Sequence, residues 1–142
     1  MNLVDANVLL YAVNEADPRH DVSRSWLDAA LSGQETIGFS WVAVLAFVRL
    51  VTKVGVFPNP LGVGAALDRV GAWIAAPPVV ITHPTHRHLD VLAGLLAEVG
   101  TGGNLTSDAH LAALALEHNA TVVTYDRDFG RFPGVRWRHP GR

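Results

Sequence analysis

Four aspartates stand where carboxylate chemistry would be expected. Asp5 directly follows a short apolar run at the start of the chain, and Asp126 and Asp128 follow a second apolar run near its end. Asp108 lies at the start of a segment with helical spacing. If the two apolar runs are strands of one parallel sheet, their carboxyl ends lie at the same edge, so we expect these acids to converge there.

Carboxylates that converge at one edge repel one another, and without a cation some of them would be protonated. Ligation by oxygen atoms alone suits Mg²⁺ or Mn²⁺. An ion held in this way commonly serves phosphate chemistry by activating water. The chain has no cysteine, which excludes disulfides, zinc–cysteine sites and thiol catalysis.

Each acid also has an ordinary explanation. Asp5 could cap a helix that begins at Ala6, and Asp108 could be a first-turn acid favoured by the helix dipole. Asp126 and Asp128 could be turn residues. Taken singly, these explanations are the better ones, but convergence of the acids at one edge favours a metal site.

The elements that would position the acids alternate between strands and helices. We expect strands at 3–4, 36–39, 79–81, 121–124 and 135–137, and helices at 6–13, 18–31, 41–52, 65–75, 85–99 and 107–118. The strands are short and apolar on both faces, which is typical of a parallel sheet between two helix layers. The predicted fold class is therefore α/β.

Several polar and small residues predict where these helices begin and end. Ser40 is expected to cap the helix at 41–52, and Thr106 or Ser107 the one near Asp108. Asn119 is a candidate for a left-handed helix stop. Residues 55–64 are rich in glycine and proline and predict a loop.

Length and composition predict one domain spanning residues 1–142. Hydrophobic residues make up 49% of the chain and charged residues 17%, which excludes bulk disorder. The longest apolar run is too short to cross a membrane. The first five residues include the acid Asp5 and no basic residue. A signal peptide begins with basic residues, so we expect a cytoplasmic protein.

The charge is distributed unevenly. The net charge of −2 offers no global positive field for nucleic acid. Five of the eleven cations nevertheless lie in the last sixteen residues, among them Arg127, Arg131 and Arg136. This segment is either a solvated tail or a local edge that binds phosphates.

Three segments in series resemble the PIN domains, and their order and spacing match the VapC toxins of type II toxin–antitoxin pairs. They are LVDANVLLY at 3–11, GNLTSDAHLAALA at 103–115 and TVVTYDRDF at 121–129, followed by FPGV at 132–135. The resemblance covers nearly the whole chain. It implies a three-layer α/β/α sandwich with a short central parallel sheet.

The resemblance also implies a Mg²⁺- or Mn²⁺-dependent endoribonuclease that hydrolyses RNA with metal-activated water. It further implies a homodimer neutralised by a VapB-type antitoxin. Asp5 and Asp108 would be the principal metal ligands, Asp126 would complete the cluster and Asp128 would lie beside it. Asn7 would hold Asp5 or the attacking water by a hydrogen bond.

One position departs from the family pattern. The glutamate that the family usually carries in the helix at 41–52 aligns with Ala46, and no acid occurs from Thr36 to Leu67. The loss should weaken metal affinity, and Asp128 could compensate. The alternative is a PIN-like module that binds RNA or an antitoxin without cutting.

Other chemistries fit the residues less well. A haloacid-dehalogenase-type phosphohydrolase needs a second aspartate at the position of Asn7, and a receiver domain needs a lysine near the acids, whereas Lys53 is the only lysine. The histidines at 83, 86, 88 and 110 are interpreted as solvated or capping surface groups. Trp137 could stack on a base, although a core or interface role is the simpler interpretation.

Overall fold

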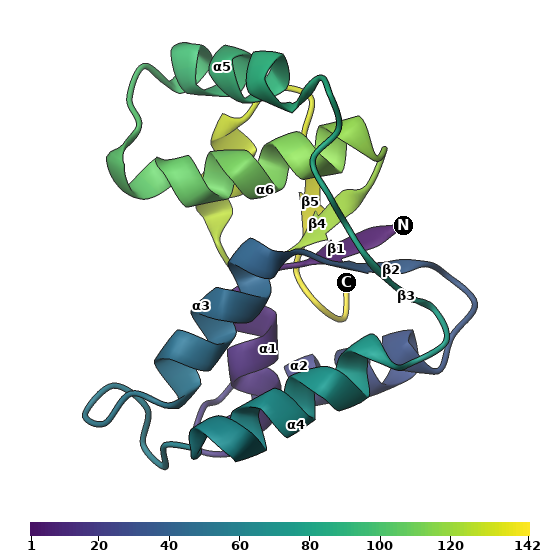
Figure 1. Cartoon of the computed structure of the whole chain (residues 1–142), viewed down its shortest axis with the longest axis vertical. Helices are drawn as coiled ribbons and strands as arrows, with labels where there is room; N and C mark the ends of the chain where they lie inside the picture. Colours follow the sequence, from purple (N-terminus) through teal and green to yellow (C-terminus); the bar gives the residue numbers. More distant parts are fainter.

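A five-stranded sheet forms the centre of the molecule (Figure 1). The computed structural model describes all 142 residues. Its strands are β1 (Asn2–Val4), β2 (Ile37–Phe39), β3 (Val79–Ile81), β4 (Thr121–Val123) and β5 (Arg136–Arg138). All pairings are parallel, in the order β3-β2-β1-β4-β5. The prediction of a parallel sheet is confirmed, and the strands that precede Asp5 and Asp126 are neighbours.

Six α-helices and two short 3₁₀ helices connect the strands. The α-helices are α1 (Ala6–Val13), α2 (His20–Leu31), α3 (Trp41–Val51), α4 (Val63–Ile74), α5 (His88–Val99) and α6 (Thr106–Glu117). The 3₁₀ helices are η1 (Gly103–Leu105) and η2 (Arg127–Arg131). None of the helices combines the length and apolarity needed to span a bilayer.

Alternate residues of the central strands point into two separate cores. Val4 and Val123 belong to a cluster with buried side chains of α1, α2, α3 and α4. Leu3 and Val122 belong to a second cluster with α5 and α6. Because successive side chains of a strand point to opposite faces, each helix layer covers its own face. The three-layer α/β/α sandwich is confirmed.

Two of the expected helix-end signals are present. The Ser40 hydroxyl accepts a hydrogen bond from the backbone N–H of Ala43 at 3.3 Å and caps α3. Asn119 has a φ of 53°, the left-handed conformation expected of a helix stop. Both signals depend on neighbours in the sequence, and they are therefore readable without tertiary information.

Other helix boundaries differ from the expectation. Neither Thr106 nor Ser107 caps α6, because η1 leads directly into it and its turns supply the backbone partners. Helix α4 begins at Val63, inside the predicted loop. Helix α5 begins at His88, three residues later than expected, and it is preceded by a turn in which the Thr85 hydroxyl oxygen accepts from the backbone N–H of Arg87.

Candidate active site

Asp5 performs two structural tasks with its two carboxylate oxygens. It is the N-cap of α1, with Oδ1 accepting from the backbone N–H of Ala6 at 2.7 Å. Oδ2 accepts from the Thr124 hydroxyl at 2.7 Å and from Asn7 Nδ2 at 3.2 Å. A carboxylate has about four acceptor positions, so capping the helix leaves Asp5 with capacity for one more ligand.

Thr124 is a residue of the candidate site that the sequence analysis missed, because it was assigned only to the end of a strand. Its side chain is fully buried. The hydroxyl donates to Asp5 and accepts from Asn7 Nδ2 at 3.1 Å and from the backbone N–H of Asp126 at 2.9 Å. One hydroxyl therefore fixes the carboxylate after β1 to the chain that follows β4.

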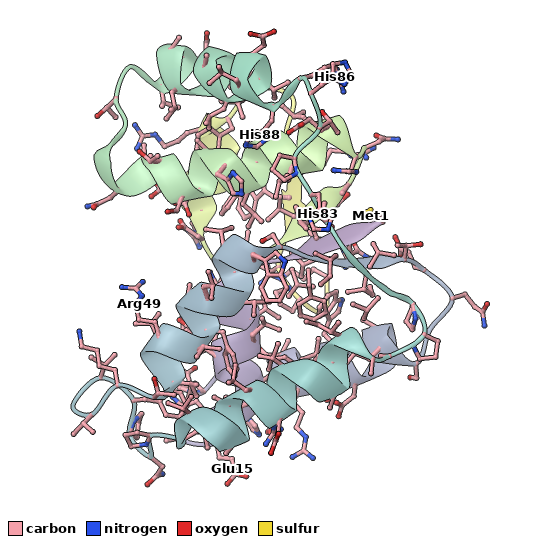
Figure 2. The ribbon with its side chains drawn as sticks, in the orientation of Figure 1. Met1, Glu15, Arg49, His83, His86 and His88 are labelled. Atoms are coloured by element: carbon pink, nitrogen blue, oxygen red, sulfur yellow. The ribbon has the colours of Figure 1, made fainter.

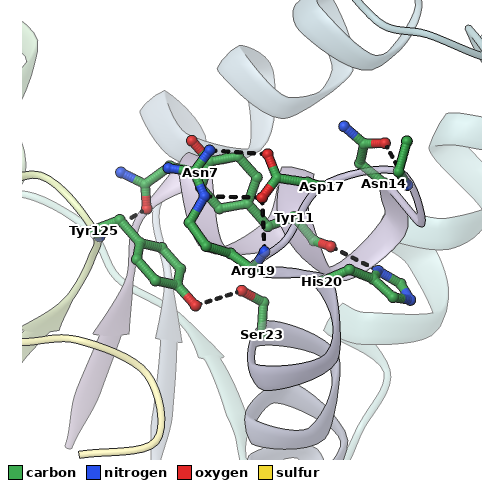
Figure 3. Close-up of polar contacts among 9 residues, drawn as sticks. Asn7, Tyr11, Asn14, Asp17, Arg19, His20, Ser23 and Tyr125 are labelled. Atoms are coloured by element: carbon green, nitrogen blue, oxygen red, sulfur yellow. Dashed lines mark hydrogen bonds and ion pairs between the residues drawn. The ribbon is translucent and has the colours of Figure 1, made fainter.

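Asn7 completes this connection. Its Oδ1 accepts from the backbone N–H of Tyr125 at 3.1 Å (Figure 3). Its amide therefore bridges the first turn of α1 and the loop after β4, while it also bonds Asp5. Because every polar side-chain atom of Asn7 and Thr124 is hydrogen-bonded, the position of the Asp5 carboxylate is tightly set.

A second group of acids lies beside this one. Asp108, Asp126 and Asp128 each offer a carboxylate oxygen within 4.8 Å of the others. Asp126 is the N-cap of η2, and its Oδ1 accepts from the backbone N–H of Asp128 at 2.8 Å. Asp108 is half-buried in the first turn of α6, whereas Asp128 is exposed.

Burial and the neighbouring charges both act on Asp108. Desolvation is the largest cause, and repulsion from Asp126, Asp5 and Asp128 adds to it, raising the pKa of Asp108 to about 7. Desolvation also raises the pKa of Asp5, although hydrogen bonds from Thr124 and Ala6 oppose it. The charges of Asp5, Asp126 and Asp128 therefore all act on Asp108, which lies among them.

A small hollow joins Asp5 to Asp108 on the α3 side. It has a volume of about 100 Å³ and a mostly apolar wall. It is lined by Asp5, Ala6, Val42, Ala43, Ala46, Ser107, Asp108 and Leu111. Ala46 thus faces the acids, as the sequence alignment predicted, and no carboxylate projects from α3 into the hollow.

The side chains fit a hard divalent cation. The donors are all carboxylate oxygens, which Mg²⁺ and Mn²⁺ prefer. Desolvation is the main cause of the raised pKa of Asp108, and repulsion from the neighbouring carboxylates, which a cation would relieve, adds to it. Asp108 is shared by the hollow and by the three-acid group, so it is the central candidate ligand.

The expected phosphate-binding arginines divide into two kinds. Arg127 and Arg131 are exposed on η2, and neither makes an ion pair or a side-chain hydrogen bond within the chain. Arg136 instead donates to the carbonyl and side-chain oxygens of Asn119. Of these three arginines, Arg127 and Arg131, which lie beside Asp126 and Asp128, are therefore available to a ligand.

The histidine interpretation was wrong for two residues. His88 Nδ1 lies 2.5 Å from the buried carboxylate of Glu117, and its Nε2 lies 2.9 Å from His110 Nδ1. Figure 2 shows His88 between α5 and α6, whereas His86 lies on the outside. The spacing of His88, His110 and Glu117 gave no signal because they come from two helices separated in sequence.

Three comparisons place the chain among known proteins. A family model described as PIN domain matches residues 3–135. The chain is 61% identical over 140 residues to Ribonuclease VapC37 of Mycobacterium tuberculosis, covering 99% of this chain and 97% of that protein.

Two solved structures share the fold. The crystal structure of VapBC2 from Rickettsia felis bound to a DNA fragment from their promoter matches with a TM-score of 0.70 and 18% identity, covering 97% of each chain. Mycobacterium tuberculosis VapC20, a Sarcin-Ricin loop cleaving toxin, matches with a TM-score of 0.68 and 18% identity, covering 96% of this chain and 99% of that one.

Proposed function

Since the chain belongs to the PIN domain family and, within it, to the VapC ribonucleases, we propose that its carboxylate edge is the active site of a metal-dependent endoribonuclease. The observation that carries this proposal is the convergence of Asp5, Asp108 and Asp126 from three separate elements. We assign the whole of residues 1–142 to one PIN-like domain.

Asp108, Asp126 and Asp5 are the metal ligands in this proposal, with Asp128 at the exposed side. When bound, Mg²⁺ or Mn²⁺ would supply a Lewis acid that lowers the pKa of water and offsets charge on the phosphodiester. The protein holds the carboxylates in place: Thr124 and Asn7 fix Asp5, and the start of η2 fixes Asp126. Arg127 and Arg131 contact the RNA backbone.

We further propose that the enzyme is the toxin of a type II pair. The similar Rickettsia felis structure is a VapBC complex, and this supports a VapB-like antitoxin as the partner. The exposed apolar side chains Trp41 and Leu45 on α3 support a homodimer. An RNA substrate also favours a cytoplasmic location.

The proposed function is tested by RNA cleavage with purified, antitoxin-free protein in Mg²⁺, in Mn²⁺ and in EDTA. We expect metal-dependent cutting that Asp108→Asn and Asp5→Ala each abolish. Asp68→Asn, which alters an exposed acid on α4, is the matched control and should cut like the parent. Cutting that survives in EDTA or in both site variants would contradict the mechanism.

Ala46 supports a second candidate, a PIN-like module that binds RNA or antitoxin without cutting. Ala46 lies in the apolar wall of the hollow, at the position where the family usually carries a glutamate. The acids of this chain therefore lack that carboxylate. Ala46→Glu would add a carboxylate facing Asp5 and Asp108. If the parent binds RNA but cuts nothing, and Ala46→Glu gains cutting, the binding module is the correct function. Cutting by the parent excludes it.

A further inference from the structure

Four aromatic side chains form a series of edge-to-face and tilted ring contacts that runs from α1, past the chain that follows β4 and β5, to Trp137 within β5. The ring centroids of Tyr11 and Tyr125 are 5.3 Å apart, those of Tyr125 and His139 are 5.6 Å apart, and those of His139 and Trp137 are 5.6 Å apart. Each of these side chains keeps part of its surface exposed. We call them the aromatic row.

The row is attached directly to the acid site. Tyr125 lies between Thr124 and Asp126 in the sequence, and its backbone N–H is bonded by Asn7. Tyr11 is one turn beyond Asn7 on the same face of α1, as Figure 3 shows. The two rings are therefore neighbours of residues that hold the Asp5 carboxylate.

Polar contacts fix the Tyr11 end of the row. The Tyr125 hydroxyl and the Ser23 hydroxyl are 2.8 Å apart, which ties the ring to α2 (Figure 3). The Arg19 guanidinium lies 3.7 Å from the centroid of the Tyr11 ring and is held by Asp17 at 2.8 Å. These contacts set the rings in place before any ligand arrives.

The other end of the row lies against η2. A side chain at Gly130 would meet the Trp137 indole at 3.4 Å, so the ring lies on the backbone of that helix. The same short helix carries Arg127 and Arg131, whose guanidinium groups have no partner in the chain. These unpaired cations thus lie next to Asp126 and beside Trp137, which packs against the α5–α6 core and keeps part of its surface exposed.

We propose that the aromatic row stacks the unpaired bases of a single-stranded RNA next to the phosphodiester that is cut. Aromatic rings in a row with neighbouring cations are the usual means of holding a single strand, since every base has a π-face. Bases in a duplex are already stacked and paired, so the row selects loops and unpaired ends. This inference rests on the proposed ribonuclease function.

The test measures equilibrium binding of a fluorescein-labelled ten-nucleotide RNA in EDTA, by fluorescence anisotropy. The parent protein should bind the single strand roughly 5- to 150-fold more tightly than an abasic oligomer of the same length. It should also prefer the single strand to the duplex. Equal affinity for the normal and abasic oligomers would overturn the proposal, and this comparison needs no variant to fold.

Substitutions test which side chains are responsible for the base-dependent binding of RNA. Trp137→Leu should weaken binding of the normal strand roughly 5- to 150-fold and leave binding of the abasic oligomer unchanged, whereas Trp137→Phe keeps a ring and most of the affinity. Arg127→Gln and Arg131→Gln should instead lower the salt dependence, by a slope of about 0.7 for each lost phosphate contact. A Trp137→Leu loss that is equal for both oligomers would contradict stacking.

Cleavage is scored separately in Mg²⁺ and Mn²⁺, so the two proposals can fail independently. Base-dependent binding without any cleavage would support the aromatic row and refute the ribonuclease. Metal-dependent cleavage with base-independent binding would support the ribonuclease and refute the row.

Discussion

The hydroxyl of Thr124 joins the two strand ends that carry the acids. Thr124→Val keeps the shape of the side chain but leaves Asp5, Asn7 and the backbone N–H of Asp126 without a shared partner. Because groups that orient metal ligands affect metal affinity and activity by about 10–100-fold, we expect a loss of that size. Single-turnover RNA cleavage and calorimetric titration with Mn²⁺ measure it.

Thr124→Ser is the matched control for this prediction. It retains the hydroxyl and should stay within a few-fold of the parent in both measurements. A valine variant that binds Mn²⁺ and cuts as well as the parent would show that Thr124 does not position Asp5.

Asp108 gives the metal-free protein a defined pH dependence. Its pKa is raised from 3.8 to about 7, so between these values the folded state holds a proton that the unfolded state has lost. The contribution of Asp108 to stability therefore falls as the pH rises from 4 to 7. Asp108→Asn removes this dependence. The melting temperature of the variant minus that of the parent should therefore increase as the pH rises.

Thermal unfolding in EDTA at pH 5 and pH 8 checks this. We expect the difference in melting temperature, variant minus parent, to be larger at pH 8. A difference that stays the same at both pH values would mean that Asp108 is ionised throughout. Asp68→Asn, at an exposed acid on α4, should show no such trend.

The contact between α5 and α6 depends on one buried carboxylate. Glu117 Oε1 accepts from the hydroxyl of Thr85 at 2.6 Å and from its backbone N–H at 2.9 Å, and Oε2 is bonded by His88. Burial raises the pKa of Glu117, but these hydrogen bonds outweigh it, and the pKa is lowered overall. Its stabilising contribution is therefore present above about pH 4.5 and is lost as the pH falls further.

Glu117→Gln should lower the free energy of unfolding at pH 7 by about 1.5–3 kcal/mol, the usual contribution of hydrogen bonds to a charged group. Urea denaturation at pH 7 measures this change. Glu98→Gln, on the exposed part of α5, is the control and should leave the urea midpoint unchanged. An equal effect of both substitutions would mean that the loss of net charge, and not the buried contact, is responsible.

The features predicted correctly from the sequence are those encoded locally. The Ser40 cap and the left-handed Asn119 depend on a few neighbouring residues, and the parallel sheet follows from short strands that are apolar on both faces. The errors arose where distant segments meet. Thr85 and His88 are bonded by Glu117, about thirty residues away, and nothing in the sequence near either residue indicates this contact.

The same distinction applies to the site. The acids were found because aspartates after strand ends are conspicuous, and the position of Ala46 followed from the family alignment. Thr124 and the pairing of His88 with His110 were missed, because a threonine in a strand and a histidine on a helix are ordinary by themselves. Their roles come from partners that only the folded chain supplies.

The exposed apolar surface of the molecule predicts self-association. Trp41 and Leu45 lie one turn apart on α3 and are 50% and 62% exposed. Covering such side chains is favourable, so we expect light scattering at micromolar protein to give twice the 15.2 kDa of one chain. Leu45→Glu should give the mass of a single chain.

Leu67→Glu, which alters an exposed leucine on α4, is the control for this prediction and should leave the dimer intact. A monomeric parent would refute the homodimer. A Leu45→Glu variant that remains dimeric would place the interface on another surface.

The link between Asp5 and Thr124 spans 119 residues of sequence, and this separation affects how the protein is made. A ribosome synthesises the amino-terminal strand first and the β4 strand almost last. At about 5–20 residues per second, some 6–24 s pass before the second half of the site exists. A chain still in translation therefore has no assembled carboxylate cluster, and the candidate active site exists only once nearly the whole chain has been made.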